Sequence, residues 1–380
     1  SPEPAQWIAR GDYATSTSPA AVVGTTTPTV LAEVTASSLL MGKDIWLTEG
    51  RPMPLFVQNM FSQRTEAQTV SAVLSSYGIG GTYPHVRTGN SEILLDPAYL
   101  GTTADFYVRH RTSLIDRRYR RALNVHIAPA ISSGSPNILL IGNSLTNRGA
   151  GAWLDTRLAA LGFTPTYTGS IIGQGTDGGD LTGTNGEGRE GWKFADFTYE
   201  DTAFTPVAVG GEAAYLALSK ANKRLVNPFI RVTTGGDDPA HVFNGYIFDL
   251  DFYLTRFGYA DPDVVLIELG TNDFAQGSAS QSLTWVTNGL AAMVASVRAT
   301  LPSAHIGLIV HNMPRSSNGD AEWTERYAGI KEHVRYVAAA ADSNLHIIPA
   351  WQHMSSEFGW GDTLVSTDTR SWRTAPLSAS

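Results

Sequence analysis

The sequence contains no cysteine at all, and only 16% of its residues are charged. The first absence excludes disulfides, thiolate metal sites and a cysteine nucleophile. Acidic residues outnumber basic ones, with 27 Lys+Arg, 35 Asp+Glu and a formal net charge of -8, and no basic stripe offsets that balance. This charge argues against nucleic acid as the main partner.

Long apolar runs are also missing. No stretch approaches the ~20 apolar residues that span a bilayer, so we expect no membrane insertion. The N-terminal sequence SPEPAQWIARGDYATSTSP lacks the basic-then-apolar layout of a signal peptide, and a first residue other than Met is typical of a processed, cloned or partial sequence. With 380 residues and 42% hydrophobic content, the chain has enough apolar material for a sizeable core and is expected to form two domains.

Composition divides the chain into three parts. Residues 1–38 are rich in Ser, Thr, Ala and Pro and are predicted to be an extended arm or linker. Residues 39–133 contain short apolar or alternating runs separated by Gly, Pro, Asn and Asp, which predicts a β-rich, sandwich-like domain. The segment SSGSPN is the expected boundary, and residues 134–380 form the last part.

In residues 134–380 strand and helix patterns alternate, which predicts an α/β domain with a parallel sheet covered on both faces. The glycine-rich segment GGDLTGTNGEGREG does not follow a strand with the spacing of a phosphate-binding loop and is compatible with a flexible surface loop. The predicted strands are NILLI, PTYTG, DVVLIEL, HIGLIV and LHIIPA, and the predicted helices are Gly149 to Leu161, Leu283 to Leu301 and Ala321 to Ala341.

A small polar corner follows the first of these strands. Ile138 to Ile141 form the apolar run of a strand buried on both faces, and Gly142, Asn143 and Ser144 come directly before a helical pattern. In an open α/β sheet this corner lies where ligands bind. The alternative is a helix N-cap serine after a tight glycine turn, with no role in chemistry.

A second corner repeats the pattern. The apolar segment Val264 to Leu269 leads into Gly270, Thr271, Asn272 and Asp273. Because the carboxyl ends of parallel strands meet at one edge of the sheet, a serine nucleophile and an asparagine amide donor are expected to face one another there.

These residues resemble the blocks of the SGNH (GDSL-type) hydrolases. Gly-Asn-Ser-Leu-Thr is similar to the first block, with Asn143 where Asp is commoner; GEGREGW resembles the second block and contains Gly191; and Gly-Thr-Asn-Asp matches the third. The resemblance spans about residues 137–380 and implies a flavodoxin-like three-layer fold without a metal or organic cofactor. It implies acyl transfer, with Ser144 as nucleophile and with the N–H groups of Ser144 and Gly191 and the Asn272 amide as the oxyanion hole. Asp273, Thr146 and Arg148 are expected to anchor the loops.

The Asp-x-x-His block that supplies the base in this family does not appear. No histidine follows His353, and residue 350, where the Asp would fall, is Ala350. Three explanations stay open. The block follows Ser380; or His353 or His311 serves as base, with Asp362 or Asp368 as orienter; or the domain has lost catalysis.

The segments NPFI and FDLDFYLTRFGYADPDVV resemble longer SGNH esterases of phage tails and of glycan-degrading bacteria. With the nine Trp and 14 Tyr of the chain as possible sugar-stacking groups, this resemblance implies a serine esterase that removes O-acetyl groups from a surface polysaccharide. The expected location is a virion tail or the extracellular space, and the expected partners are an acetylated glycan and other virion tail proteins, with a homotrimeric assembly. The alternatives are a non-catalytic glycan-binding or structural tail-fibre module and a secreted bacterial esterase.

Overall fold

The structure is a computed structural model that describes residues 41–62, 70–77, 84–89, 92–110, 117–173, 183–311 and 319–354. The predicted arm (residues 1–38) and the candidate orienters Asp362 and Asp368 lie outside the described residues. The chain divides into two compact units, which comprise Ser1–Ala130 with Trp351–Ser356, and Ile131–Ala350 with Glu357–Ser380. The chain therefore passes from the first unit to the second after Ala130 and is part of the first unit again from Trp351.

The first unit contains a five-stranded sheet in the order β1-β7-β6-β3-β4, in which β1 is parallel to β7 and the other pairs are antiparallel. A separate antiparallel pair is formed by β2 and β5. Alternating side chains of these strands are buried together, as period-2 patterns require. The strands are β1 (Asp44–Thr48), β2 (Met53–Phe56), β3 (Val70–Tyr77), β4 (Pro84–Gly89), β5 (Glu92–Leu95), β6 (Thr103–His110) and β7 (Arg117–Ala128).

Most of the short helix α12 (Ala350–His353) belongs to this first unit. The buried Asn59 amide donates hydrogen bonds to the carbonyls of Trp351 and Met354, both at 2.8 Å. Two backbone acceptors at the end of the chain's described part are thereby satisfied by one side chain.

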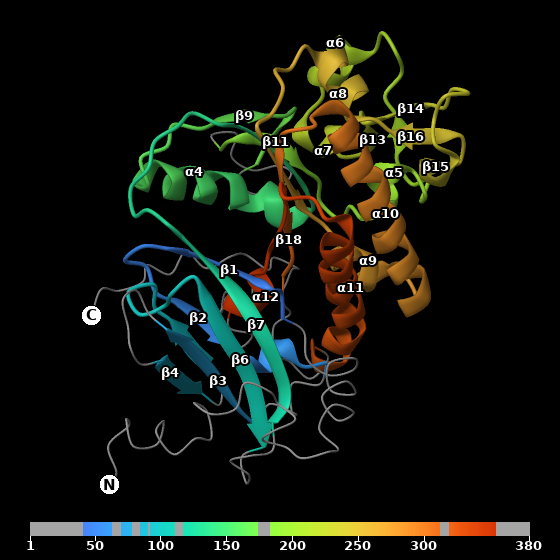
Figure 1. Ribbon diagram of the computed structural model, residues 1–380. Coiled ribbons are helices and arrows are strands. Elements are labelled where there is room, and N and C mark those ends of the chain that lie inside the picture. Colours follow the sequence, from blue (N-terminus) through green and yellow to red (C-terminus); the bar gives the residue numbers. More distant parts are fainter. Residues whose placement is uncertain are drawn as a thin grey trace, which may run out of the picture. The chain divides into compact units, whose positions relative to one another are not determined.

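The second unit is built on a seven-stranded sheet, with the path β10-β11-β8-β17-β18-β19 and with β9 also paired to β8. Strands β9, β11 and β18 of this sheet are labelled in Figure 1. All pairs of this sheet are parallel except β10 with β11. When β8, β9, β17, β18 and β19 are numbered 1 to 5 along the chain, their order across the sheet is 2-1-3-4-5. The sheet therefore grows to one side of β8 with β9 and to the other side with β17, so the topological switch point lies between β8 and β17. The strands are β8 (Asn137–Gly142), β9 (Thr166–Thr168), β10 (Ile171–Ile172), β11 (Asn185–Gly188), β17 (Val264–Glu268), β18 (His305–Ile309) and β19 (Leu345–Ile348).

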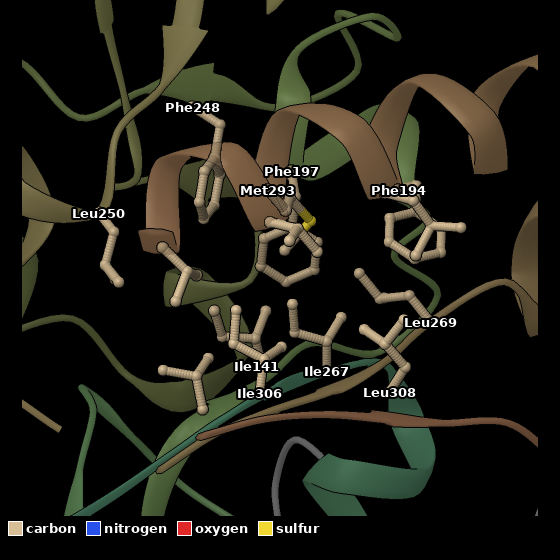
Figure 2. Close-up of a cluster of buried hydrophobic side chains, with 14 of the residues drawn as sticks. Ile141, Phe194, Phe197, Phe248, Leu250, Ile267, Leu269, Met293, Ile306 and Leu308 are labelled. Carbon is tan, nitrogen blue, oxygen red and sulfur yellow. The ribbon is translucent and has the colours of Figure 1, made fainter. Parts of the chain in front are cut away.

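Helices cover both faces of this sheet, because the apolar runs of β8 and β17 point side chains to both sides. Leu139, Ile141 and Ile267 join a large core with the helices α5, α8 and α10, and Figure 2 shows Ile141 and Ile267 below Phe197 and Met293. Ile138 and Leu140 face the other way, toward Leu154 and Leu158 of α4. The helices are α4 (Gly151–Ala160), α5 (Phe194–Thr198), α8 (Leu250–Phe257), α9 (Thr271–Gln276), α10 (Ala279–Thr300) and α11 (Gly319–Ala340).

The prediction of a mixed α/β fold with a parallel sheet is confirmed, and each of the five predicted strands and three predicted helices has a counterpart. The surface-loop interpretation of the glycine-rich segment is wrong for residues 185–188, which form strand β11 of the main sheet. The second unit also contains two small sheets that were not predicted: a three-stranded antiparallel sheet, β14-β16-β15, and a parallel pair, β12 and β13. These strands are β12 (Thr205–Pro206), β13 (Val226–Asn227), β14 (Ile230–Val232), β15 (Val242–Phe243) and β16 (Tyr246–Phe248), and the short helices α6 (Glu212–Leu216) and α7 (Lys220–Lys223) lie between β12 and β13.

Within the described ranges, no helix is long and apolar enough to cross a bilayer. Among the same residues, no group of three or more His, Asp or Glu is arranged to hold a metal ion.

Candidate active site

The candidate site lies at the point where the strand order of the second unit reverses. Strands β8 and β17 are neighbours, and Gly142 at the end of β8 pairs with Glu268 at the end of β17. Ser144 follows the first strand and Asn272 follows the second. In open parallel sheets ligands bind outside the carboxyl ends of the strands at such a switch point.

The Ser144 corner is a tight turn without bulky side chains. Asn143 Oδ1 accepts a hydrogen bond from the Leu145 N–H at 2.8 Å, and the Asn143 carbonyl accepts one from the Asn147 N–H at 3.0 Å. A Cβ atom on Gly142 would lie 2.0 Å from Thr146 Oγ1, so only glycine fits there. Ser144 itself is half-buried, and a π-helical turn, Thr146–Ala150, follows it.

The loop that carries Gly191 is attached to this corner. The Arg189 N–H donates to the Gly142 carbonyl at 2.8 Å, and a Cβ on Gly188 would lie 2.4 Å from the Asn147 nitrogen. Gly191 has φ +81°, a conformation that side chains of L-residues disfavour, and a Cβ built on it meets no atom within 4 Å. A small group can therefore approach the Gly191 backbone closely.

Glu190 ties the same loop to the turn after Ser144. Its carboxylate accepts hydrogen bonds from Asn147 Nδ2 at 2.8 Å and from Arg148 Nε and Nη2 at 2.9 and 2.6 Å. Arg148 thus has the anchoring contacts expected of it, and the bidentate geometry favours one fixed loop position.

The loop after β17 is bonded to the Gly191 loop in turn. Asn272 Nδ2 donates to the Trp192 carbonyl at 2.9 Å, and Gln276 Nε2 donates to the Gly191 carbonyl at 2.9 Å. The buried Asp273 carboxylate accepts the Phe194 N–H at 3.1 Å, and burial raises its pKa to about 7. An amide has two N–H donors, so the Asn272 side chain can make this bond and still offer a second donor to a ligand.

A buried polar cluster adjoins the Gly191 loop, and it was not predicted from the sequence. Glu187 and Arg189 form an ion pair with both side chains fully buried. Tyr253 donates to Glu187 Oε1 at 2.6 Å, and Arg189 Nη2 donates to the Tyr215 hydroxyl at 2.7 Å. The only signal in the sequence is a Glu and an Arg two residues apart in a glycine-rich segment, which does not indicate burial.

A second buried carboxylate, Glu268, lies beside the Ser144 turn. It accepts hydrogen bonds from Asn143 Nδ2 at 3.1 Å and from Thr146 Oγ1 at 3.2 Å. His311, which follows β18 and is also buried, has its Nε2 atom 3.3 Å from Glu268 Oε1. The sequence signal for Glu268 is one acidic residue within an otherwise apolar strand, which the sequence analysis passed over.

A small pocket adjoins this region between the ends of β17 and β18 and helix α11. Its polar lining consists of Thr271, His311, Arg326 and His333. Burial lowers the pKa of His333 to about 4, and its Nδ1 atom lies 2.8 Å from the Gly329 carbonyl. His333 is therefore neutral at physiological pH and donates that bond.

The structure places His353, the predicted base, in the first unit, whereas Ser144, Gly191 and Asn272 are in the second. His353 Nδ1 lies 2.8 Å from the Pro54 carbonyl. Burial lowers the pKa of His353 to about 4. His353 is thus neutral at physiological pH, with the Nδ1–H tautomer fixed by Pro54 and Nε2 left as the basic atom.

Residues 207–369 match the model of the GDSL-like Lipase/Acylhydrolase family. The match includes Asn272 and begins after Ser144 and Gly191. No curated protein matches the chain.

Several solved structures are similar to the chain at low identity. A family two carbohydrate esterase from Clostridium thermocellum in complex with cellohexaose is 15% identical, with 78% of this chain and 80% of that chain covered and a TM-score of 0.28. A carbohydrate esterase family 3 from Talaromyces cellulolyticus is 16% identical, with 56% and 77% covered and a TM-score of 0.33. A putative GDSL-like lipase from Bacteroides ovatus is 12% identical, with 78% and 69% covered and a TM-score of 0.27. On the family match, the chain carries a GDSL-like lipase/acylhydrolase domain.

Proposed function

We propose that the chain is a serine esterase that removes O-acetyl groups from a surface polysaccharide. The observation that carries the proposal is the joining of three loops, those of Ser144, Gly191 and Asn272, by direct hydrogen bonds at the switch point of the parallel sheet. The match of residues 207–369 to the GDSL-like family supports the same chemistry.

In the proposed reaction Ser144 Oγ attacks the acetyl carbonyl carbon. The new O–C bond forms as the carbonyl oxygen becomes an oxyanion, which accepts hydrogen bonds from the N–H groups of Ser144 and Gly191 and from Asn272 Nδ2. The C–O bond to the sugar then breaks, and the proton taken from Ser144 by a base passes to the sugar alkoxide. Water, activated by the same base, hydrolyses the acetyl-serine and releases acetate.

Within the chain, His311 and His353 are the candidates for the base. His311 follows β18 at the same sheet edge as Ser144 and contacts Glu268, while His353 offers a neutral imidazole. The variants His311→Gln and His353→Gln separate them, since loss of a general base costs about 10²–10⁴ in rate. A loss of that size in one variant alone identifies the base, and no loss in either rejects both.

A glycan substrate is supported by an exposed aromatic on the helix that leads away from Ser144. Trp153 of α4 is 51% exposed, and the Arg157 guanidinium lies 5.3 Å from the centroid of its ring. An indole face of this kind stacks on apolar faces of sugar rings. We further propose that the chain acts in a virion tail or outside the cell, as a homotrimer together with other virion tail proteins.

Acetate release from p-nitrophenyl acetate and from an acetylated bacterial polysaccharide tests the proposal. We expect activity on both substrates. We expect Trp153→Ala to raise KM for the polysaccharide and to leave p-nitrophenyl acetate hydrolysis unchanged, because only the polymer reaches the indole. If the wild type and Trp153→Ala hydrolyse p-nitrophenyl acetate equally and neither acts on the polysaccharide, the glycan assignment is contradicted and the protein is a simple esterase.

The second candidate function is a non-catalytic glycan-binding or structural tail-fibre module. One observation favours it: within the described residues, Ser144 Oγ is hydrogen-bonded to no histidine. A protein that binds the deacetylated and acetylated polysaccharide equally and releases no acetate from the acetylated form would establish this function in place of the esterase.

A further inference from the structure

Glu268 is a buried carboxylate in a position where parallel strands usually carry apolar residues. It is the last residue of β17, it is 2% exposed, and its backbone pairs with Gly142 beside the Ser144 turn. A buried carboxylate is costly unless its oxygens are hydrogen-bonded. Its acceptor oxygens therefore have to be matched by donors on the elements packed against it.

Two of those donors belong to the turn that carries Ser144. Asn143 Nδ2 donates to Oε1 at 3.1 Å and Thr146 Oγ1 donates to Oε2 at 3.2 Å, so the two oxygens hold the turn on either side of Ser144. The Asn143 N–H also donates to the Glu268 carbonyl at 3.3 Å. The side chain and the backbone of one residue thus fix the entry and the exit of the turn.

Asn143 has to act as a donor and as an acceptor at once. Its Oδ1 accepts the Leu145 N–H at 2.8 Å while its Nδ2 donates to Glu268. An aspartate at this position would still accept from Leu145, but it has no hydrogen to give to Glu268 and would place two carboxylates in direct contact. The amide at 143, where the resemblance leads one to expect Asp, is therefore matched to the carboxylate at 268.

We propose that Glu268 is a positioning residue of the esterase and that Asn143 and Glu268 form an exchangeable pair. The inference rests on the proposed function, because the group positioned is the Ser144 hydroxyl and its neighbouring N–H. The pair requires one amide and one carboxylate in contact, in either order. When Asn143→Asp and Glu268→Gln are combined, the new glutamine amide donates to the new aspartate, and the glutamine carbonyl accepts from Thr146.

The test is a cycle of Asn143→Asp, Glu268→Gln and the double variant, measured by p-nitrophenyl acetate kinetics and by thermal unfolding. We expect Asn143→Asp to lower kcat about 10- to 100-fold with little change in KM, because the displaced turn misplaces Ser144. We expect Glu268→Gln to have a smaller effect, because the glutamine carbonyl still accepts one bond. The double variant should return kcat to within about threefold of wild type, since contacting residues are strongly non-additive.

Asn288→Asp is the matched control. Asn288 Nδ2 donates to Glu200 Oε1 at 2.9 Å in the same unit, so this change also sets two carboxylates in contact, but on helix α10. We expect it to lower the unfolding temperature and to leave kcat unchanged. The control separates loss of stability from loss of positioning.

The outcomes distinguish failure of the inference from failure of the proposed function. If the fall in kcat of the double variant equals the product of the two single-variant losses, the positioning role is overturned. The same holds if the double variant recovers its unfolding temperature while its kcat stays low. A wild-type protein that hydrolyses no ester overturns the proposed function and the positioning role with it. In that case the unfolding temperatures still show whether the pair exists, through rescue in the double variant.

Discussion

Replacement of Arg189 by methionine tests the buried cluster that supports the Gly191 loop. Methionine keeps much of the length of the side chain and its contact with Trp192, whose ring centroid lies 4.7 Å from the guanidinium. It removes the hydrogen bonds that Arg189 donates to Glu187, to the Tyr215 hydroxyl and to the carbonyls of Lys223 and Val226. The Glu187 carboxylate is left buried without its cation.

The expected loss in the free energy of unfolding is large, because the side chains of Glu187 and Arg189 are both fully buried. Removal of one member of a buried ion pair costs about 3–5 kcal/mol. The double variant Glu187→Gln with Arg189→Met also removes the isolated charge. Its loss in the free energy of unfolding should therefore be only about 2 kcal/mol, because two carbonyls lack donors at a cost of about 1 kcal/mol each.

Hydrogen exchange of the amides of β17 measures this effect, because it reports the free energy of opening of the second unit alone. The matched control is Arg120→Met in the first unit, measured by exchange of the β6 amides of that unit, since Arg120 pairs with Asp105 and the two side chains are 29% and 39% exposed. An exposed pair contributes about 0–1 kcal/mol. If Arg189→Met loses no more than this control, the cluster does not stabilise the unit and our reasoning about the Gly191 loop is refuted.

Three further predictions concern the site itself. Asn272→Ala should lower kcat about 10²–10³-fold in the p-nitrophenyl acetate assay through loss of an oxyanion donor, and an unchanged kcat would remove Asn272 from the site. Gly191→Ala, with φ +81°, and its control Gly210→Ala, with φ +80° and equally open space, should each cost about 1–2 kcal/mol in unfolding experiments, but only Gly191→Ala should lower kcat/KM. Burial raises the folded-state pKa of Asp273 to about 7, so its contribution to stability is present below its ordinary pKa near 3.8 and is lost as pH rises through 7. The unfolding temperature of Asp273→Asn should therefore fall less than that of wild type between pH 4 and 8, and parallel curves would show that Asp273 does not titrate as proposed.

The main sheet of the second unit was predictable because its strands are continuous apolar runs bounded by turn residues. Ile138–Ile141 and Val264–Ile267 indicate buried parallel strands without any tertiary information. Strand β11 was not predictable in this way, because Asn-Gly-Glu-Gly has no apolar pattern. It forms because its backbone pairs with β8 and because Gly188 allows close packing on Asn147.

The residues of the candidate site also differ in whether a local sequence pattern could predict them. Ser144, Gly191 and Asn272 were predicted from short motifs, because each motif is local in the chain. Glu187, Arg189 and Glu268 were missed, because their roles depend on partners far away in sequence, such as Tyr253 for Glu187 and Asn143 for Glu268. The Glu190 contacts to Asn147 and Arg148 are of the same long-range kind.

Ser144 as nucleophile is central to the proposed esterase, and one measurement tests it directly: kcat/KM for p-nitrophenyl acetate of the wild-type protein and of Ser144→Ala, both shown to unfold at the same temperature. We predict that Ser144→Ala lowers kcat/KM by at least about 10³-fold, since removal of a catalytic serine abolishes the covalent route. Activity of Ser144→Ala within a few-fold of wild type would contradict the account.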